Sequence, residues 1–313
     1  MRASFIDRLM QMAENDEKII LVTGDLGFGV LDEYIKRFPR QYINAGVTEQ
    51  SMMSLSAGLA SMGYRVFVYS IGNFPTLRCL EQIRNDVCLM NNSVVIVSVG
   101  AGYSYGAQGY SHHALEDISI MRTLPNLEVL SPCNTFETKE LTTLLCNSSG
   151  PAYLRLGLSK ESLEGFVGPE VELGKFRLMK AGDDGAIIFT GAIGEIAVQA
   201  AEKLSQLGVE LALYSAPFIS TVDLDTLRTI AKKGLLITLE EQAGEGGFGS
   251  SILEKLSDLN IQCKTKRIYA SRLDLLESGS QKYLQEFNGL SPDRMVSEIT
   301  ELLNQETRTI SKA

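Results

Sequence analysis

The segment Asn44-Ala45-Gly46-Val47-Thr48-Glu49-Gln50 opens a predicted helix that is rich in small residues. Its continuation, Ser51-Met52-Met53-Ser54-Leu55-Ser56-Ala57-Gly58-Leu59-Ala60, carries no charge, which is typical of a helix buried on most of its sides. Glu49 is therefore an acidic residue at the start of a helix that is predicted to be buried. It either complements the helix dipole or binds a specific partner, because buried acids need such partners.

Outward from this helix, strand and helix patterns alternate along the chain. The uniformly apolar run 94–99 is typical of a strand that is buried on both faces. Such alternation predicts α/β layers with mainly parallel sheets. The predicted strands are 19–23, 65–69, 94–99, 152–156, 185–189, 210–214 and 235–239, and the predicted helices are 5–13, 48–61, 74–89, 194–207, 223–233 and 247–257.

The length of 313 residues allows two domains, each with its own core. The strand 152–156 is expected to close the first domain, and Gly165, Gly168 and Pro169 indicate a linker after it. We therefore predict a first domain over 1–160, a linker over 161–174 and a second domain over 175–313.

Composition excludes several classes of function. The net charge of −9, without a basic run, argues against a nucleic-acid-binding surface. No apolar stretch has the length of about 18 residues that a membrane helix needs, and the N-terminus lacks the apolar core of a signal peptide. The five cysteines are scattered and the chain has two histidines, so neither disulfides nor a metal site is expected. We expect a cytoplasmic protein.

Two loops follow predicted strands and are candidates for a site. Gly24-Asp25-Leu26-Gly27-Phe28-Gly29 lies at the carboxyl end of a strand, where open α/β sheets bind ligands. Residues 100–113 form a long glycine-rich loop that contains three tyrosines and ends on His112 and His113. Long loops inside compact domains are usually functional.

Four stretches, in order, resemble the pyrimidine-binding domain of thiamine diphosphate enzymes of the transketolase family. They are Asn44–Gln50, Tyr69-Ser70 leading to Ile83-Arg84, Gly109–His113 with Glu116-Asp117, and Leu124–Leu127 followed by Ser131-Pro132 and Glu137-Thr138. Four ordered matches over about a hundred residues are far more specific than one motif. The resemblance continues weakly to the end of the chain and implies two three-layer α/β domains, a pyrimidine-binding domain and a transketolase C-terminal domain.

The resemblance also assigns residues to the cofactor. Glu49 would bond N1′ of the aminopyrimidine of thiamine diphosphate and activate it, and Phe74 would pack on the same ring. The positions that are aromatic in the family fall on Gly72, Pro75 and Arg78 in this segment. Phe74 therefore either replaces the missing aromatic ring from a neighbouring position or is a core residue. Asp25 would lie near the cofactor and the dimer interface, or alternatively cap a turn.

Further positions would contact substrate. His112 matches the histidine that faces the reacting oxygens of the substrate, and His113 is either a second such group or structural. Gln108 stands where transketolases have an aspartate that reads a sugar hydroxyl, so specificity is expected to differ. Arg155 and Arg2 match phosphate-binding positions, which suits a phosphorylated or otherwise anionic substrate.

One part of the family pattern is missing. Transketolases hold Mg²⁺ and the diphosphate with a Gly-Asp-Gly motif and a downstream Asn, and this chain has no Gly-Asp-Gly. The resemblance therefore implies the C-terminal subunit of a split transketolase. A separate subunit would supply the ligands of Mg²⁺ and the diphosphate, in a heterotetramer with two copies of each chain. The isolated chain would be inactive.

The expected reaction is transfer of a two-carbon ketol unit from a ketose to an aldose acceptor. Within the superfamily, the alternatives are the β subunit of a 2-oxoacid dehydrogenase or an acyl transfer like that of deoxyxylulose-phosphate synthase. From a different class, the chain could be a non-catalytic partner subunit that retains the fold.

Overall fold

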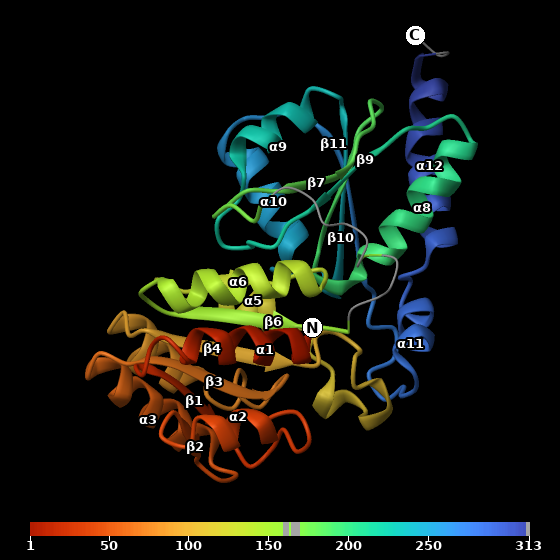
Figure 1. Ribbon diagram of the computed structural model, residues 1–313. Coiled ribbons are helices and arrows are strands. Elements are labelled where there is room, and N and C mark those ends of the chain that lie inside the picture. Colours follow the sequence, from red (N-terminus) through yellow and green to blue (C-terminus); the bar gives the residue numbers. More distant parts are fainter. Residues whose placement is uncertain (159–162, 164–169, 311–313) are drawn as a thin grey trace.

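The computed structural model describes residues 1–158, 163 and 170–310, which form two α/β domains stacked on each other (Figure 1). The N-terminal domain runs from red to yellow-green, and the C-terminal domain runs from green to blue. Most of the predicted linker, 161–174, lies outside the described residues, so the predicted domain limits stay a prediction.

The first domain contains a six-stranded sheet in the order β2-β1-β3-β4-β6-β5, and all of its paired neighbours are parallel. The predicted limits of β1, β4 and β6 are confirmed, whereas β2 and β5 are three residues long and show no usable sequence pattern. The strands are β1 (Ile19–Thr23), β2 (Tyr42–Asn44), β3 (Arg65–Ile71), β4 (Val94–Val99), β5 (Glu128–Leu130) and β6 (Ala152–Leu156).

Helices cover both faces of this sheet, because each buried strand sends alternate apolar side chains to opposite sides. Leu21 and Phe67 pack in one core with Phe5 of α1, and Val22 packs in the other core with Met52 of α3. The helices are α1 (Arg2–Ala13), α2 (Asp32–Arg37), α3 (Glu49–Ser61), α4 (Leu80–Gln82), the π-helix η1 (Ile83–Leu89), the 3-10 helices η2 (Gly106–Gln108) and η3 (Tyr110–His112), α5 (Asp117–Met121) and α6 (Thr135–Asn147).

The helix predicted over 74–89 is wrong in its first part, since helical structure begins only at Leu80. Pro75 has no backbone N–H and disfavours a helical conformation at Phe74 before it. The hydroxyl of Thr76 donates to the carbonyl of Gly72 at 3.1 Å and stabilises a series of turns instead. Residues 72–79 are therefore a turn segment, which we call the arginine turn because it carries Arg78.

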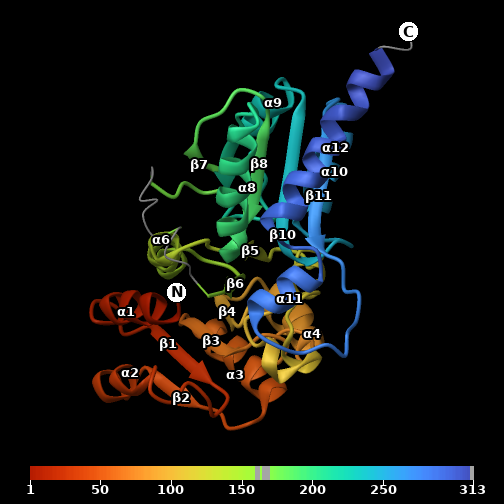
Figure 2. The ribbon, with the colours of Figure 1, turned by 90° about the vertical axis from the view of Figure 1, so that its right-hand side faces the viewer.

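The second domain contains a five-stranded sheet in the order β11-β10-β8-β9-β7, in which only the edge strand β7 is antiparallel to its neighbour. Helices α8 and α12 run side by side on one face, and α9 and α10 cover the other (Figures 1 and 2). The elements are β7 (Arg177–Lys180), β8 (Ala186–Thr190), η4 (Gly191–Ile193), α8 (Gly194–Gln206), β9 (Ala212–Ser215), α9 (Leu224–Ala231), β10 (Leu235–Ala243), α10 (Phe248–Asp258), β11 (Lys264–Ala270), α11 (Gln281–Phe287) and α12 (Pro292–Ile310).

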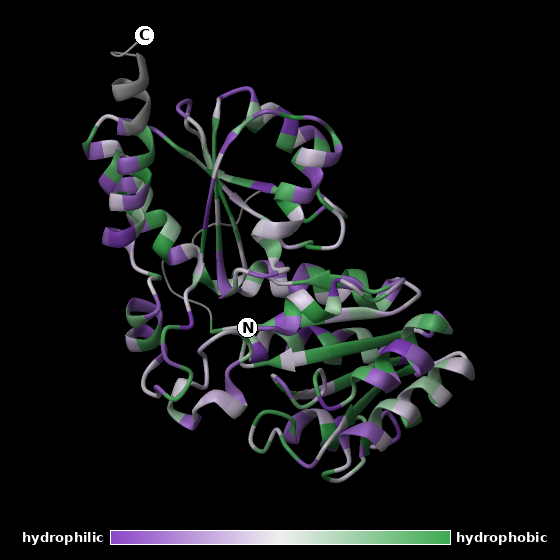
Figure 3. Cartoon of the chain, turned by 180° about the vertical axis from the view of Figure 1, so that it is seen from behind, coloured by the Kyte–Doolittle hydropathy of each residue, from purple (hydrophilic) through white to green (hydrophobic). Residues whose placement is uncertain are grey.

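The predicted α/β architecture with mainly parallel sheets is thus confirmed. The distribution of hydropathic residues agrees with this architecture. The central strands of the first sheet are apolar, and its helices carry polar residues on their outer sides (Figure 3). In the part of the chain that the structure describes, no helix is long and apolar enough to cross a membrane.

The two domains are joined by backbone and side-chain bonds around the end of β5. The N–H of Ile219 donates to the carbonyl of Val129 at 2.9 Å, and Leu130 and Phe218 form an antiparallel bridge. The Arg177 guanidinium of β7 reaches Glu137 of α6 at 2.6 Å, and both side chains are buried. Such a buried network favours one fixed arrangement of the domains.

Candidate active site

Glu49, the first residue of α3, has a specific partner. Its side chain is buried, and its Oε2 lies 2.8 Å from Nη1 of Arg78 in the arginine turn. The sequence left open whether Glu49 merely complements the helix dipole. The ion pair adds a directed interaction to that effect, and it places the carboxylate beside the carboxyl ends of the parallel strands.

From Glu49, a row of side chains leads to the glycine-rich loop. The Arg78 guanidinium lies over the Phe74 ring, with 4.9 Å between Cζ and the ring centre. The Phe74 ring meets His112 edge to face with 5.2 Å between ring centres, and His112 lies 6.5 Å from Tyr105. The structure therefore brings Glu49, Phe74 and His112, which are distant in sequence, into one site.

A cavity of about 270 Å³ opens beside this row. It is lined by Asn73, Phe74, Leu77, Arg78, Tyr110, Ser111 and Glu116. The cavity lies between the arginine turn and the end of the glycine-rich loop, so a bound molecule would contact both Phe74 and the backbone beside His112.

Asp25 fixes the turn at the end of β1. Its backbone is in the left-handed region, with φ at +57°. Asn44 donates from Nδ2 to the Asp25 carboxylate at 3.0 Å, and the Asn44 Oδ1 accepts from the N–H groups of Asp25 at 3.1 Å and of Gly46 at 2.9 Å. These bonds tie β1 to the segment that leads into Glu49. They support the turn interpretation of Asp25, while a contact with the cofactor stays a prediction.

The two histidines differ in their surroundings. His113 is buried, its Nε2 lies 3.1 Å from the carbonyl of Gly106, and its ring meets Tyr103 edge to face. His112 is only partly buried, and its Nδ1 lies 3.0 Å from the hydroxyl of Ser111. His113 therefore holds the loop together, whereas His112 is available to a ligand. Gln108 is exposed at the end of η2.

The two arginines predicted to bind phosphate also differ. Arg2 is exposed, and its Nη1 donates to the hydroxyl of Tyr105 at 3.4 Å, so it reaches the row of site residues. Arg155 is buried, and its Nε donates to Asp117 at 2.6 Å. Its Nη2 donates to the carbonyls of Ala114 at 2.8 Å and Glu241 at 3.1 Å.

These bonds support a structural role for Arg155, while a contact with the phosphate of a substrate stays a prediction. On β6 the Arg155 side chain points into the domain interface, where the buried Asp117 needs a counter-charge. Arg155 is not among the residues that line the cavity.

The second domain holds the glycine-rich loop in place. The carboxylate of Glu241, in β10, accepts the backbone N–H of Tyr103 at 2.9 Å and also bonds Nε2 of Gln281. The loop passes so close that a Cβ on Gly102 would lie 2.5 Å from the Glu241 carboxyl carbon, and Gly102 has φ of +60°. The N–H of Gly279 donates to the carbonyl of Gly106 at 3.2 Å. The loop thus lies between both domains.

Neighbouring Glu240 is buried and points the other way. Its carboxylate accepts the N–H groups of Phe248 at 2.7 Å and Gly249 at 2.8 Å, at the start of α10. Burial raises the pKa of Glu240 to about 7, although these two bonds and the nearby Arg155 lower it. Burial likewise raises the pKa of Glu241. Glu241 thus connects the two domains, whereas Glu240 stabilises the start of α10 within the second domain.

Sequence reasoning missed three residues of this region: Arg78, Tyr105 and Glu241. Of these three residues, Arg78 could have been noticed in the sequence, because it occupies a position that is normally aromatic in the family that the chain resembles. The roles of Tyr105 and Glu241 depend on contacts between distant segments, which no local pattern reveals.

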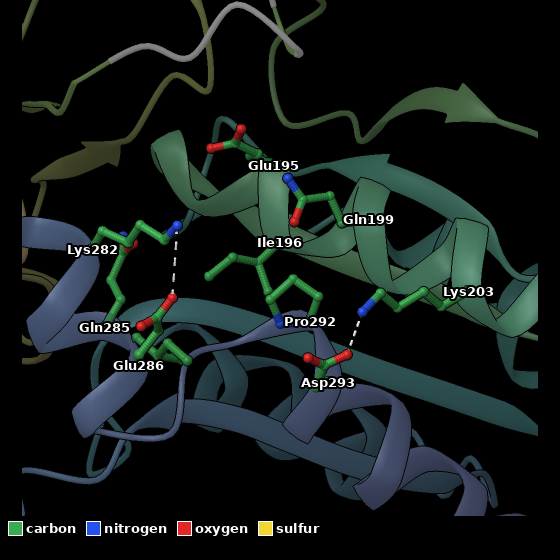
Figure 4. A pocket seen from close by; sticks show the side chains of 10 residues that line it. Glu195, Ile196, Gln199, Lys203, Lys282, Gln285, Glu286, Pro292 and Asp293 are labelled. Atoms are coloured by element: carbon green, nitrogen blue, oxygen red, sulfur yellow. Dashed lines mark hydrogen bonds and ion pairs between the residues drawn. The ribbon is translucent and has the colours of Figure 1, made fainter.

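A larger cavity, of about 520 Å³, lies away from these residues, between α8, α11 and the start of α12 (Figure 4). Four of its five charged side chains pair with one another, since Lys282 pairs with Glu286 and Lys203 with Asp293. Over the described residues, no group of three or more His, Cys, Asp or Glu side chains is arranged to hold a metal ion. The row from Glu49 to Arg2 is thus the better candidate for chemistry.

Comparison with known proteins agrees with this assignment. Residues 1–163 match the family model "Transketolase, pyrimidine binding domain", and residues 174–295 match "Transketolase, C-terminal domain". The chain belongs to the transketolase family. Within that family, it corresponds to the C-terminal subunit of a split transketolase, as the relatives below indicate.

Several relatives are single chains of similar length. The chain is 35% identical to one subunit of the apulose-4-phosphate transketolase of Phocaeicola vulgatus, over 82% of this chain and 83% of the relative. It is 30% identical to "Putative transketolase C-terminal section" of Methanocaldococcus jannaschii, over 98% and 97%. A solved structure described as "Split gene transketolase, inactive beta4 tetramer" is similar with a TM-score of 0.87 and 28% identity, over 97% and 98%.

The chain is also similar to longer proteins. It is 34% identical to "1-deoxy-D-xylulose-5-phosphate synthase" of Microcystis aeruginosa, over 83% of this chain but 41% of the relative. The relation to this synthase thus covers less than half of its length.

Proposed function

We propose that this chain contributes Glu49, Phe74 and His112 to a thiamine diphosphate site that a separate subunit completes. The reaction is transfer of a two-carbon ketol unit from a ketose to an aldose acceptor. The observation that carries the proposal is the buried carboxylate of Glu49, which shares one site with the Phe74 ring and the accessible His112.

The residues fit the aminopyrimidine of this cofactor. A carboxyl group with little access to water can bond a ring nitrogen firmly, and a phenylalanine face suits a planar heterocycle. When bound, thiamine diphosphate supplies the centre that stabilises the negative charge left on carbon as the donor's C2–C3 bond breaks. Glu49 holds a proton at N1′ of the aminopyrimidine, and Phe74 orients the ring.

The loop residues act on the substrate. His112 donates a hydrogen bond to the reacting oxygen and exchanges a proton with it, while Ser111 at Nδ1 orients the imidazole. Gln108 contacts a sugar hydroxyl. His113 and Asp25 keep the loop and the β1 turn in position.

An anionic substrate fits the positive charge beside the site. Arg2 reaches the row through Tyr105, and its planar guanidinium can bind a phosphate with two hydrogen bonds. The relative from Phocaeicola vulgatus is named for a phosphorylated ketose, which supports a phosphorylated donor here as well.

The partner subunit supplies the ligands of Mg²⁺ and of the diphosphate. Two large apolar side chains in the segments after β1 and before Glu49 are exposed, Phe28 at 82% and Val47 at 71%, and a partner subunit would cover them. We place the active sites between unlike chains in a cytoplasmic heterotetramer with two copies of each subunit.

The test is a ketol-transfer assay with a phosphorylated ketose and an aldose. We expect activity only after the partner subunit is added, and Glu49→Gln should lower kcat at least about 100-fold. The control is Glu195→Gln, since Glu195 also lies in the first turn of a helix. Full activity of the Glu49 variant, or an equal loss in the control, would contradict the role of Glu49 and favour a non-catalytic subunit.

A second candidate function is decarboxylating acyl transfer, which the similarity to 1-deoxy-D-xylulose-5-phosphate synthases favours. It requires a 2-oxoacid and releases CO₂, whereas ketol transfer releases none. Trapping CO₂ from a labelled 2-oxoacid distinguishes the two, and acylation of a lipoyl carrier would indicate a 2-oxoacid dehydrogenase instead.

A further inference from the structure

Arg78 makes the two contacts that the proposed function assigns to the cofactor's aminopyrimidine. Its Nη1 lies 2.8 Å from the Glu49 carboxylate, and its Cζ lies 4.9 Å from the centre of the Phe74 ring. The guanidinium therefore occupies the space between the acid and the aromatic ring. A pyrimidine cannot bond Glu49 and pack on that face of Phe74 while Arg78 keeps this position.

The chemistry of the two groups is alike. A guanidinium is planar, carries N–H donors along its edge and stacks on aromatic faces. An aminopyrimidine is also planar, bonds a carboxyl group through its edge and stacks through its face. A carboxylate with little access to water needs such a partner, because leaving it without a counter-charge or donors is costly. Arg78 meets this need before a ligand arrives.

Arg78 is also placed so that it can leave. Its side chain is 49% exposed, and it belongs to the arginine turn, which is not part of a regular helix. Gln50 donates from Nε2 to the backbone carbonyl of Arg78 at 3.2 Å, which holds the main chain independently of the side chain. Rotation of the side chain into solvent thus breaks the ion pair without disturbing the core.

We propose that Arg78 holds the place of the cofactor: its guanidinium binds Glu49 in the free subunit and is displaced when the aminopyrimidine of thiamine diphosphate binds. This inference rests on the proposed function of Glu49. Displacement consumes part of the binding energy of the pyrimidine. The diphosphate contacts of the partner subunit must compensate for it, which couples capture of the cofactor to assembly of the two subunits.

The test measures binding of thiamine diphosphate to the assembled complex at saturating Mg²⁺, by calorimetry for Kd and by stopped flow for the association rate. Arg78→Gln should lower Kd about fivefold, equivalent to about 1 kcal/mol, and raise the association rate. Arg78→Lys keeps the charge but loses the planar group, so its Kd should lie between those of Arg78→Gln and the wild type.

The control is Arg228→Gln, because Arg228 is also 49% exposed and paired with an acid, Asp225, in the second domain. Its Kd should equal that of the wild type. An unchanged or weaker affinity of Arg78→Gln in a folded, assembled complex would overturn the inference. If Arg78→Gln fails to assemble with the partner subunit, the Kd of Arg78→Lys is the test. A Kd of Arg78→Lys equal to or higher than that of the wild type would contradict the displacement of Arg78 by the cofactor.

Glu49→Gln separates this inference from the proposed function. If Glu49→Gln leaves cofactor affinity unchanged, Glu49 does not bind the pyrimidine, and the proposed function fails. If Glu49→Gln weakens binding but Arg78→Gln has no effect, only the role of Arg78 fails.

Discussion

Two arginine–carboxylate pairs in the first domain have nearly the same bond length but different surroundings. Arg78 lies 2.8 Å from Glu49, and Arg155 lies 2.6 Å from Asp117. The Arg78 side chain is 49% exposed and lies over an aromatic ring, whereas that of Arg155 is 3% exposed and also donates to two backbone carbonyls. Distance alone does not separate a replaceable pair from a structural one. Exposure and the number of other bonds do.

The largest expected effect is on the Arg155 pair. Arg155→Met should lower the free energy of unfolding by about 3–5 kcal/mol, because it leaves the buried Asp117 without its counter-charge. Urea unfolding measures this change. Adding Asp117→Leu should recover much of the loss, since replacing both charges by apolar groups removes the uncompensated acid. A loss below about 1 kcal/mol in the single variant would mean that Arg155 is not a structural residue.

Glu240, buried at the start of α10, should make stability depend on pH. Its folded pKa of about 7 lies above the ordinary value of 4.5, so the folded state binds the proton more tightly than the unfolded state. The free energy of unfolding should therefore fall by about 3 kcal/mol as pH rises from about 4.5 to about 7, and stay lower at higher pH. Glu240→Gln should remove this slope in urea titrations, and Glu301→Gln on the exposed side of α12 should not. An unchanged slope in the Glu240 variant would contradict the assignment.

Arg78→Gln should change stability far less than Arg155→Met. An ion pair with a half-exposed arginine contributes about 1 kcal/mol or less, so the free subunit should unfold at nearly the same urea concentration as the wild type. A loss as large as that of Arg155→Met would remove the contrast between the two pairs and would make Arg78 a structural residue.

Arg2 should affect the substrate and not the fold. Arg2→Gln is expected to raise KM for a phosphorylated donor about tenfold with little change in kcat, because a phosphate contact remote from the reacting carbon binds substrate and transition state equally. Steady-state kinetics with the phosphorylated and the unphosphorylated ketose measure the effect. An equal rise in KM for both sugars would show that Arg2 does not bind the phosphate.

Much of the fold could be predicted from the sequence, since long buried strands such as 94–99 and the uncharged helix after Glu49 have strong patterns. Edge strands did not follow such patterns, because β11 is mostly half-buried and its burial alternates only over its last three residues. For these elements, pairing with a neighbouring strand decides the structure.

The candidate site was predictable in part. Glu49, Phe74 and His112 were identified from motifs, and the structure brings them together. The structural bonds of Arg155 were not predictable, because its position on β6 does not reveal that its side chain pairs with Asp117. Arg78 was overlooked because its role depends on a turn caused by Pro75 and Thr76, where a continuous helix was predicted.

The central claim is that Glu49 belongs to half of a thiamine diphosphate site. The most direct measurement is calorimetric titration of thiamine diphosphate and Mg²⁺ into the chain alone and into its mixture with the partner subunit, each with wild-type protein and Glu49→Gln. We predict binding only in the mixture, with affinity at least about tenfold weaker for the variant. Tight binding by the isolated chain, or equal affinities of wild type and variant in the mixture, would contradict the claim.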